Sequence, residues 1–344
     1  MSFDSASAYT TLYPYFHQRL HLDESLANHS SFGAGGKADI WLPLETQQEL
    51  RDLIDMCTRQ RWPLLVVGDG SNILYADAGV RGIVASIAFR SYHLEEQVGE
   101  TALLVAEAGV HWRPLLHELA AHGWGGLEFA IGIPGTLGAG VISNVGAHNR
   151  ELGQVLEWIE VLDARACNAI EENAETFPVL TLRHYPAEAL DLSYRHSRFR
   201  EQRLTHIDAD GHLIFPPRHL IEPPEIVVEL ALRVHREDPA VLKATLEQFS
   251  QERQQVEPTR RHMGSIFKDP PGTTARTLLE QVGLAGKRYG RAQMAERNPN
   301  YIMNVGGATA SEIAALIIEA HQQVLTQKGI HLALNVELLG EWQQ

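Results

Sequence analysis

The stretch Leu64-Leu-Val-Val-Gly-Asp-Gly-Ser-Asn-Ile-Leu74 decides how this chain is interpreted. It is an apolar run that leads into two glycines and then into a second apolar run. A second stretch, Gly126-Leu-Glu-Phe-Ala-Ile-Gly-Ile-Pro-Gly-Thr-Leu-Gly-Ala-Gly140, has the same character. In such loops the backbone N–H groups can approach an anion with no Cβ in the way. Two of them in one chain indicate a large ligand that carries a pyrophosphate, such as a dinucleotide.

Neither loop matches a standard nucleotide fingerprint. Gly68-Asp-Gly70 is followed by Ser71, Asn72 and a second predicted strand, so the third glycine of GxGxxG is missing. This argues against a Rossmann turn, and the absence of GxxxxGK[ST] from the sequence excludes a P-loop. Taken singly, each loop is equally compatible with an ordinary glycine turn.

Composition narrows the classes of protein and partner. A chain of 344 residues normally holds two or three domains. The net charge of −14 argues against nucleic acid as the main partner. The two cysteines, Cys57 and Cys167, imply no disulfide framework, and the 17 histidines show no HExxH spacing, so we expect no metal. The N-terminus lacks signal-peptide character, and the least polar stretch, 129–142, is too short to span a bilayer. We therefore expect a cytoplasmic protein with no membrane partner.

The positive charge is concentrated in residues 251–291. Eight basic residues stand against four acidic ones there, a local balance of +4: Arg253, Arg260, Arg261, Lys268, Arg276, Lys287, Arg288 and Arg291 against Glu252, Glu257, Asp269 and Glu280. A solvated helix face is one explanation. The alternative is a pocket for a phosphorylated, carboxylated substrate, since an anion-binding cleft needs local positive potential whatever the overall charge. We favour the pocket because the motif Gly264-Ser-Ile-Phe-Lys-Asp-Pro270 lies inside this stretch.

Hydrophobic spacing predicts helices over residues 45–59, 111–122 and 240–254, and strands over 63–67, 155–163, 225–234 and 331–339. A short helix is expected over 14–20, with Pro14 at its first position. Thr309-Ala-Ser-Glu312 matches a capping box, which starts a final helix that ends at Gly329. Strands mixed with helices, without strict alternation, predict an α+β protein.

A series of motifs in a fixed order identifies a family. They are Asn28-His-Ser-Ser-Phe-Gly33, Gly35-Gly36, Val67-Gly-Asp-Gly-Ser-Asn72, Gly126-Leu-Glu-Phe129, Ile133-Pro-Gly-Thr136, Asn144-Val-Gly-Ala147, Tyr194-Arg195-His-Ser197, Gly264-Ser-Ile-Phe-Lys-Asp-Pro270 and Asn304-Val-Gly-Gly-Ala-Thr-Ala310. Together they resemble the UDP-N-acetylenolpyruvoylglucosamine reductase (UDP-N-acetylmuramate dehydrogenase) family over nearly the whole chain. Since Pro270-Pro-Gly272 leads almost directly into Leu278, the chain resembles the shorter form of the family, without a lid insertion.

The resemblance implies a fold and a domain division. It implies a two-subdomain FAD-binding fold of the vanillyl-alcohol-oxidase (PCMH) type and a C-terminal α/β substrate domain. The first FAD subdomain would cover residues 1–90, joined by the terminal strand 331–344. The second would cover 91–237, and the substrate-binding domain 238–330.

The resemblance also implies an activity: reduction of the enolpyruvyl ether of a UDP-sugar to a lactyl ether, in peptidoglycan precursor synthesis. NADPH would supply the hydride and FAD would carry it. Because the first loop holds no histidine or cysteine, we expect non-covalent FAD. The implied FAD residues are Gly68, Asp69, Gly70, Ser71, Asn72, Ile133, Pro134, Gly135, Thr136, Gly138, Gly146 and Ala147. The implied substrate residues are Tyr194, Lys268, Arg253, Arg288 and Tyr289, for which surface charge or a core aromatic is an equally good explanation. Oligomeric state is not predicted.

Three positions match the family's catalytic residues. Ser265 matches the proton donor, although by itself it would be interpreted as a cap for a helix after Pro271. Arg195 matches the arginine that holds the substrate carboxylate and the enolate, a task that suits a planar guanidinium.

The third position, Asn335, departs from the family, which has a glutamate there. Asparagine can donate a hydrogen bond to an enolate, so activity need not vanish, but it cannot shuttle a proton. If the family's glutamate acts as an acid, reduced turnover is expected, and Asn335→Glu is a gain-of-function test. Glu337 lies two residues further along the same strand face. Two alternatives stay open: a flavin- and UDP-sugar-binding homologue with impaired turnover, and another oxidoreductase on the same fold, such as an oxidase.

Overall fold

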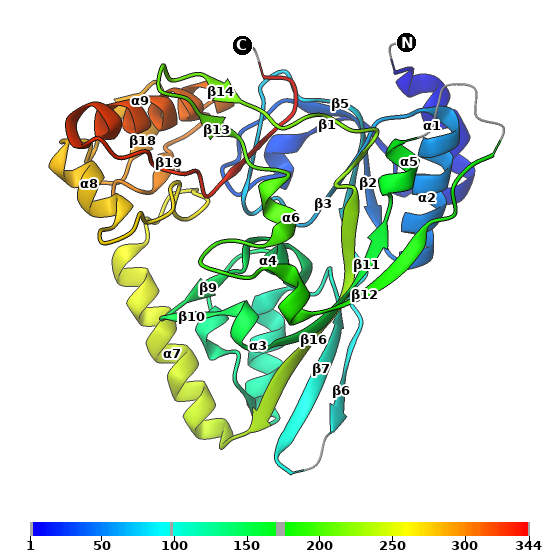
Figure 1. The fold of residues 1–344 in the computed structure, drawn as a ribbon, viewed down its shortest axis with the longest axis horizontal. Helices are drawn as coiled ribbons and strands as arrows, with labels where there is room; N and C mark the ends of the chain where they lie inside the picture. The colour runs from blue at the N-terminus through cyan, green and yellow to red at the C-terminus, as the bar shows by residue number, and fades with distance from the viewer. Residues whose placement is uncertain (1–2, 97–98, 170–175, 343–344) are drawn as a thin grey trace.

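The computed structural model describes residues 3–96, 99–169 and 176–342. Figure 1 shows two sheets and a C-terminal unit arranged around the middle of the molecule. The first sheet has the strand order β1-β2-β5-β3-β15. Its strands are β1 (His21–Ser25), β2 (Lys37–Leu44), β5 (Val80–Ile87), β3 (Leu64–Val67) and β15 (Ile221–Glu222). β1 is antiparallel to β2, and the remaining neighbours are parallel.

Both faces of the first sheet are buried, as a parallel sheet requires. Helices α1 (Ser5–Phe16) and α2 (Gln47–Gln60) join one large core with alternate residues of β2, such as Ile40 and Leu42. Trp41, on the opposite face of β2, belongs to a smaller core with residues of β4 (Ile73–Tyr75). Because β4 follows the first glycine loop directly, the predicted strand–loop–strand arrangement is confirmed.

The second sheet is antiparallel, in the order β12-β11-β16-β7-β6. Its strands are β12 (Thr181–Pro186), β11 (Leu156–Asp163), β16 (Glu225–Arg236), β7 (Thr101–Glu107) and β6 (Tyr92–Glu96), and β8 (Trp124–Gly125) pairs with the end of β16. Helices α3 (Trp112–Ala121) and α4 (Leu137–Ser143) share its core. The second glycine loop runs into α4, whose first residues are the last ones of that stretch. The second sheet therefore fixes this loop just as the first sheet fixes the other.

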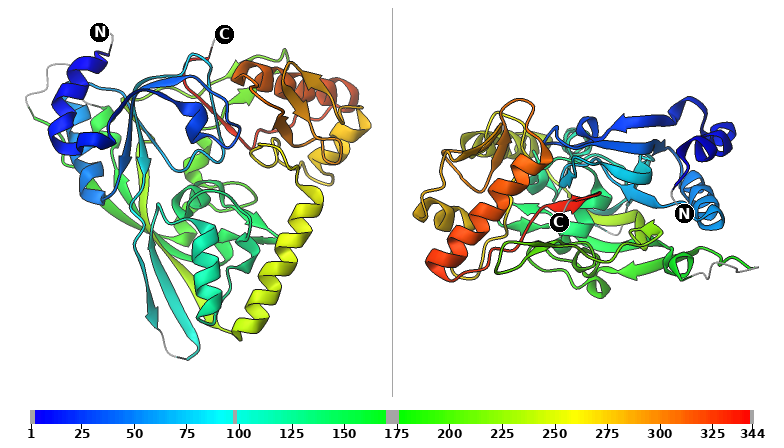
Figure 2. Two further views of the ribbon diagram at one scale, coloured as in Figure 1. Left: turned by 180° about the vertical axis from the view of Figure 1, so that it is seen from behind. Right: turned by 90° about the horizontal axis from the view of Figure 1, so that it is seen from above.

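A long helix, α7 (Pro239–Val256), leaves the second sheet and runs along one flank to the C-terminal unit (Figure 2). That unit holds α8 (Ala275–Gln281), α9 (Ala310–Lys328) and a three-stranded sheet of β17 (Arg288–Tyr289), β18 (Ala292–Met294) and β19 (Ile302–Asn304). The chain then returns, and β20 (Glu337–Leu339) pairs in parallel with β4. The return places 335–337 beside the first glycine loop.

The remaining elements are short. They are α5 (Arg165–Asn168), α6 (Arg198–Glu201), β9 (Gly146–Ala147), β10 (Arg150–Glu151), β13 (His206–Ile207), β14 (Leu213–Ile214) and the 3₁₀ turns η1 (His17–Arg19), η2 (Leu26–His29), η3 (Glu128–Ala130), η4 (Leu152–Gln154) and η5 (Ala187–Leu190). β15 lies in the range predicted for the second FAD subdomain but pairs with β3 of the first sheet. The terminal segment 331–344 ends in residues outside those described.

The capping box of α9 is confirmed: the Glu312 amide donates to Thr309 Oγ1 at 3.1 Å, and the Thr309 amide donates to the Glu312 carboxylate at 3.2 Å. The prediction of a helix over 14–20 is wrong. The helix begins at Ser5, because Asp4 accepts hydrogen bonds from the amides of Ala6 and Ser7, and it runs through Pro14.

One further expectation from the sequence needs correction, and one alternative interpretation is excluded. The strand expected over 331–339 is confined to Glu337–Leu339, preceded by an isolated bridge between Leu334 and Phe267. The helix after Pro271 starts at Ala275 and is capped by Thr274, so Ser265 is not a helix cap.

Candidate functional site

A cavity of about 470 Å³ lies where the two glycine loops, α7, residues 263–265 and the returning chain at 335–337 meet. The predicted catalytic residues Ser265, Arg195 and Asn335 all line it. Every residue predicted to bind FAD also lines it except Gly135, whose neighbours Pro134 and Thr136 are both lining residues. Segments far apart in the sequence are thus brought to one site.

The two glycine loops approach each other so closely that a Cβ added to either one would crowd a side chain of the other. A Cβ on Gly68 would lie 3.1 Å from Thr136 Oγ1, and one on Gly135 would overlap Ser71 Oγ. Ser71 Oγ also donates to the carbonyl oxygen of Pro134 at 3.3 Å. The loops therefore form a single backbone-lined cradle of the kind that binds a pyrophosphate.

Several side chains in the cavity wall carry polar atoms with no hydrogen-bond partner among the described residues. These atoms are Trp112 Nε1, His148 Nε2, Arg200 Nε and Nη1, and Arg253 Nε. Buried polar groups are rarely left unpaired in native proteins, so such atoms in a cavity call for a polar ligand. Together with the cradle, they fit the phosphates and rings of a dinucleotide.

The segment that carries Ser265 is held on both sides. Asn300 accepts from the amide of Phe267 at 2.9 Å and donates to its carbonyl at 3.0 Å. On the other side, the amide of Asn335 donates to the Ile266 carbonyl at 2.7 Å. Gly264 has a φ of +82°, which favours glycine. These bonds fix the backbone of Ser265 at the cavity.

Asn335 connects this segment to the rest of the wall. Its Nδ2 donates to the carbonyl oxygen of Ser265 at 3.0 Å, and its Oδ1 accepts from Arg200 at 3.3 Å. Its carbonyl oxygen accepts from Asn72 of the first glycine loop at 2.8 Å. The asparagine therefore lies between the predicted proton donor, a buried cation and the FAD loop.

Arg195 lies in a tight turn. Its φ is +53°, and a bridge between Ser193 and His196 closes the turn. Ser197 anchors it by donating to the Ile142 carbonyl at 2.6 Å, while Arg195 Nη2 donates to the Gly146 carbonyl at 2.7 Å. The guanidinium is thereby held against Gly146 of β9, and both residues line the cavity.

Comparison with known proteins identifies the family. Residues 39–166 match the FAD binding domain family, and residues 254–339 match the C-terminal domain of UDP-N-acetylenolpyruvoylglucosamine reductase. The UDP-N-acetylenolpyruvoylglucosamine reductase of Chloroflexus aggregans is 34% identical over 320 residues, covering 93% of this chain and 97% of the relative. The chain belongs to this reductase family.

Other members of the reductase family match this chain over a similar length. The enzyme of Rubrobacter xylanophilus is 33% identical, covering 93% of this chain and 95% of its own. The crystal structure of the Thermus caldophilus reductase superposes with a TM-score of 0.67 at 27% identity, covering 93% of this chain and 97% of that one. The α+β class and the FAD-binding fold are confirmed, and the chain is an FAD-binding oxidoreductase of this family.

The residues predicted to bind substrate are more scattered than those predicted to be catalytic. Arg253 lines the cavity and pairs with Glu257, the residue that follows the end of α7. Tyr194 is 48% exposed and donates to Asp269 at 3.3 Å. Lys268 is half-buried, and burial lowers its pKa to about 8, with Arg200 acting in the same direction. Lys268 lies outside the cavity lining.

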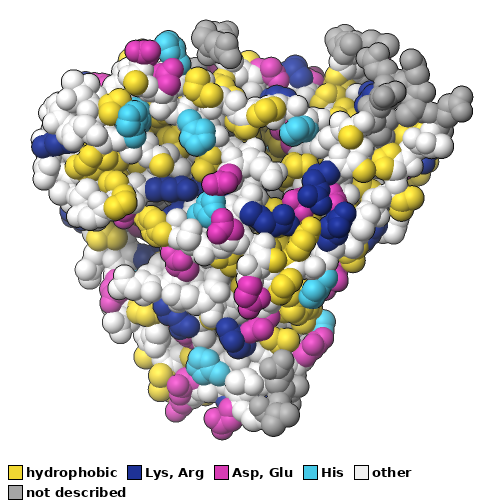
Figure 3. Space-filling view, in the orientation of Figure 1, with side chains coloured by type: hydrophobic (Ala, Val, Ile, Leu, Met, Phe, Trp, Pro, Cys, Tyr) yellow, Lys and Arg dark blue, Asp and Glu magenta, His cyan; other side chains and the backbone are white. Residues whose placement is uncertain are grey.

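Arg288 and Tyr289 lie on β17 and are exposed, Tyr289 by 54%. They too are absent from the cavity lining. The basic excess predicted over 251–291 is therefore divided between the cavity and the outer surface of the C-terminal unit. On the face drawn in Figure 3, basic and acidic side chains are interspersed.

Sequence reasoning missed Arg200, Arg203 and Tyr301 of the cavity wall. Arg200 and Arg203 follow the Tyr194-Arg195 motif closely, and that proximity was the available signal. Burial raises the pKa of the Tyr301 phenol, while a hydrogen bond with Ser265 acts in the opposite direction. Arg203 pairs with Glu337.

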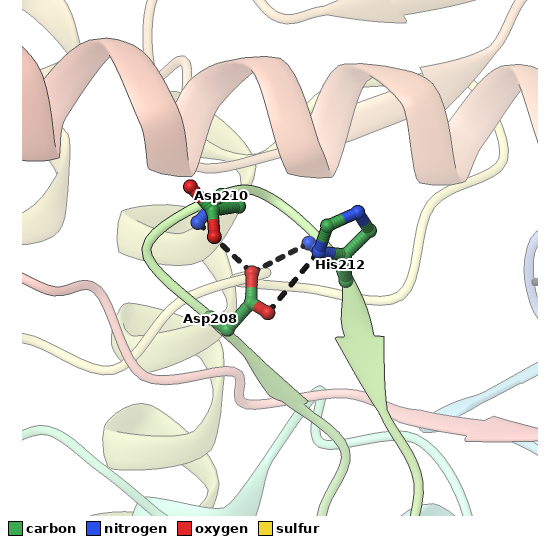
Figure 4. Close-up of side chains that lie close together, drawn as sticks. All are labelled: Asp208, Asp210 and His212. Carbon is green, nitrogen blue, oxygen red and sulfur yellow. Dashed lines mark hydrogen bonds and ion pairs between the residues drawn. The ribbon is translucent and has the colours of Figure 1, made fainter.

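A separate cluster of Asp208, Asp210 and His212 lies in the turn between β13 and β14 (Figure 4). Asp208 Oδ1 accepts from the amides of Asp210 and His212 at 2.9 and 2.8 Å, and Oδ2 lies 3.2 Å from His212 Nδ1. The carboxylate of Asp208 thus stabilises the turn itself. Among the helices of the described residues, none has the length and apolar character that crossing a bilayer requires.

Proposed function

We propose that this chain reduces UDP-N-acetylglucosamine enolpyruvate to UDP-N-acetylmuramate, with FAD as bound cofactor and NADPH as hydride donor. The observation that carries the proposal is the meeting of Ser265, Arg195 and Asn335 with both glycine loops in one cavity. A dinucleotide site alone would serve many oxidoreductases. A guanidinium, a serine hydroxyl and a carboxamide beside it suit a reaction that passes through an enolate.

FAD fits the cradle between 68–72 and 133–138, with Gly146 and Ala147 completing its wall. When bound, FAD carries a hydride from NADPH to the terminal carbon of the enolpyruvyl double bond. The protein has to orient that double bond and manage the charge that hydride addition creates.

Hydride addition places negative charge on the neighbouring carbon and its carboxylate. Arg195 pairs with the carboxylate in a planar, charge-assisted contact. Asn335 donates a hydrogen bond from Nδ2 to the enolate oxygen. Ser265 then gives its hydroxyl proton to the carbon, which completes the lactyl ether, and recovers a proton from solvent.

The uridine diphosphate would lie toward the basic residues of the C-terminal unit, with Arg253 of the cavity wall as its first contact. Lys268, Tyr194, Arg288 and Tyr289 would lie further out along its path. This assignment divides the chain into residues 1–90 with 331–344 and residues 91–237 for FAD, and residues 238–330 for substrate. The product is a peptidoglycan precursor, so the enzyme would act in the cytoplasm and serve cell-wall biogenesis, cell shape and division.

The test separates the two half-reactions. The purified, FAD-loaded protein is reduced anaerobically with one equivalent of NADPH, UDP-N-acetylglucosamine enolpyruvate is added, and the flavin absorbance is followed. Return of the oxidised spectrum with formation of one equivalent of UDP-N-acetylmuramate is the expected result. UDP-N-acetylglucosamine, which lacks the enolpyruvyl group, is the matched control and should leave the flavin reduced.

A flavin that bleaches with NADPH but stays bleached with the enolpyruvyl substrate would contradict the proposal and favour a binding homologue. Rapid reoxidation by oxygen, unaffected by substrate, would favour an oxidase instead.

A further inference from the structure

Arg200, on the short helix α6, is a buried cation in the wall of the proposed active site. Its side chain is 0% exposed, and the residue contributes to the cavity lining. Nη2 donates to both the carbonyl oxygen and Oδ1 of Asn335. Nε and Nη1 have no hydrogen-bond partner anywhere in the described part of the chain. A guanidinium that is buried in this way is costly unless its charge is used.

No carboxylate within the described residues forms an ion pair with Arg200. The nearby acid, Glu337, is paired with Arg203 at 2.9 Å. Burial lowers the pKa of Arg200 to about 10; the charge of Glu337 opposes this, whereas Arg195 and Arg203 add to it. At neutral pH Arg200 therefore keeps its proton, and this part of the wall carries an excess of positive charge.

The carboxamide of Asn335 has only one possible orientation. Arginine offers only donors and a carbonyl only accepts, so Oδ1 must face Arg200 and Nδ2 must face the Ser265 carbonyl. Nδ2 has a second hydrogen, and Asn335 lines the cavity. A positive charge held against Oδ1 polarises the amide and strengthens the donation from Nδ2.

A glutamate at 335 would remove both the available charge of Arg200 and the donor that faces the Ser265 carbonyl. Its carboxylate would form an ion pair with Arg200 and cancel the charge, and its second oxygen would lie toward the Ser265 carbonyl. That arrangement is repulsive unless the acid is protonated. Arg200 and residue 335 thus work as a unit in which neutral asparagine leaves the arginine charge available.

We propose that Arg200 is a positioning residue that acts through Asn335: it orients and polarises the carboxamide so that Nδ2 donates strongly to the oxyanion formed at the substrate's enolpyruvyl carboxylate. This inference rests on the proposed function. Asn335 then stabilises the oxyanion electrostatically, where a glutamate would act as an acid. The Asn335→Glu variant should consequently be slower than the natural protein, the opposite of the gain expected from sequence alone.

The test uses four variants of the FAD-loaded protein: Asn335→Gln, Asn335→Glu, Arg200→Lys and Arg200→Met. Gln and Glu have the same shape and differ in charge. We measure the rate of flavin reoxidation by substrate, the rate of flavin reduction by NADPH, and the dissociation constant of the substrate from its perturbation of the oxidised flavin spectrum.

We expect Asn335→Glu to be reoxidised about 10- to 100-fold more slowly than Asn335→Gln, the range that a hydrogen bond to a charged group supplies. Reoxidation in Asn335→Glu should recover as pH falls and the new carboxylate is protonated, whereas Asn335→Gln should lack this pH dependence. Arg200→Lys should recover much of the rate lost in Arg200→Met, with reduction by NADPH unchanged in both.

The inference is overturned if Asn335→Glu equals or exceeds Asn335→Gln, or if Arg200→Met reoxidises like the natural protein. It is also overturned if Arg200→Met slows reduction by NADPH while substrate affinity and reoxidation stay normal, because Arg200 would then serve the flavin. If Arg200→Met does not fold, the comparison of Asn335→Glu with Asn335→Gln and the rates of Arg200→Lys decide whether the inference holds. Failure of the natural protein to be reoxidised would instead refute the proposed function, and this inference with it.

Discussion

Arg203 and Glu337 form an ion pair in the cavity wall, with 2.9 Å between Nη2 and Oε2 and side chains only 15% and 8% exposed. Removing one partner of such a pair leaves a buried charge without compensation. We expect Arg203→Met to lower the free energy of unfolding by about 3–5 kcal/mol. Urea unfolding with saturating FAD measures the change.

The double variant Arg203→Met/Glu337→Leu is the control for this effect. Apolar residues of similar size often replace a buried ion pair at little cost, so it should recover most of the stability lost by Arg203→Met. Equal instability of the single and double variants would mean that packing, and not the unpaired carboxylate, causes the loss.

Ser265→Ala should separate the two half-reactions. Loss of a positioned proton donor slows the step it serves by about 100- to 10,000-fold. Reoxidation of the flavin by substrate should therefore fall by that factor, while reduction by NADPH continues. The backbone should be undisturbed because Asn335 donates to the carbonyl of Ser265 and not to its hydroxyl. Stopped-flow absorbance measures both steps.

Ser7→Ala, on the exposed face of α1, is the matched substitution remote from the cavity. It should leave both rates unchanged. Unimpaired turnover in Ser265→Ala would remove Ser265 from the mechanism.

Arg195→Lys tests whether the guanidinium shape matters beyond its charge. Lysine keeps the charge but cannot both donate to the Gly146 carbonyl, as Arg195 does at 2.7 Å, and pair with a carboxylate in a planar fork. We expect kcat/KM for the UDP-sugar to fall by about 10- to 100-fold. Steady-state kinetics at saturating NADPH measure it, and near-natural activity would argue against a two-point contact with the carboxylate.

How far the sequence predicts the site depends on how local each feature is. The Thr309–Glu312 capping box and the strands around Gly68 and Gly70 depend on neighbours in sequence, and both were predicted. The contact between Arg200 and Asn335 joins residues 135 positions apart, and that between Asn72 and Asn335 spans 263. Neither the hydrophobic periodicity of the sequence nor the spacing of its motifs indicates contacts between residues so far apart. The predicted bounds of the N-terminal helix were wrong for a local reason. Pro14 was predicted to be the first helical residue, whereas Asp4 caps a helix that begins at Ser5.

The pH dependence of substrate binding should report Lys268. Burial, followed by the charge of Arg200, lowers its pKa to about 8, while Glu201 opposes the shift. Lys268 is thus charged below pH 8 and loses its charge above it, so attraction for the diphosphate weakens as pH rises. KM for the UDP-sugar should increase by up to about tenfold between pH 7 and 9, following the fraction protonated. The guanidinium introduced by Lys268→Arg stays charged over this range, so that variant should show a flatter profile; an unchanged slope would exclude Lys268 as the cause.

Gly135→Ala should release FAD by separating the two glycine loops. A Cβ at this position would overlap Ser71 Oγ, and the φ of +93° strains any L-residue. Gly272→Ala is the matched control, because Gly272 has a similar φ of +80° but no atom within 4 Å of the added Cβ. Both variants carry the backbone strain, and only the first one disturbs the cradle. We expect the FAD-to-protein ratio after gel filtration to fall sharply for Gly135→Ala and to stay near one for Gly272→Ala. Equal retention of FAD by the two variants would show that contact between the loops is not needed to hold the cofactor.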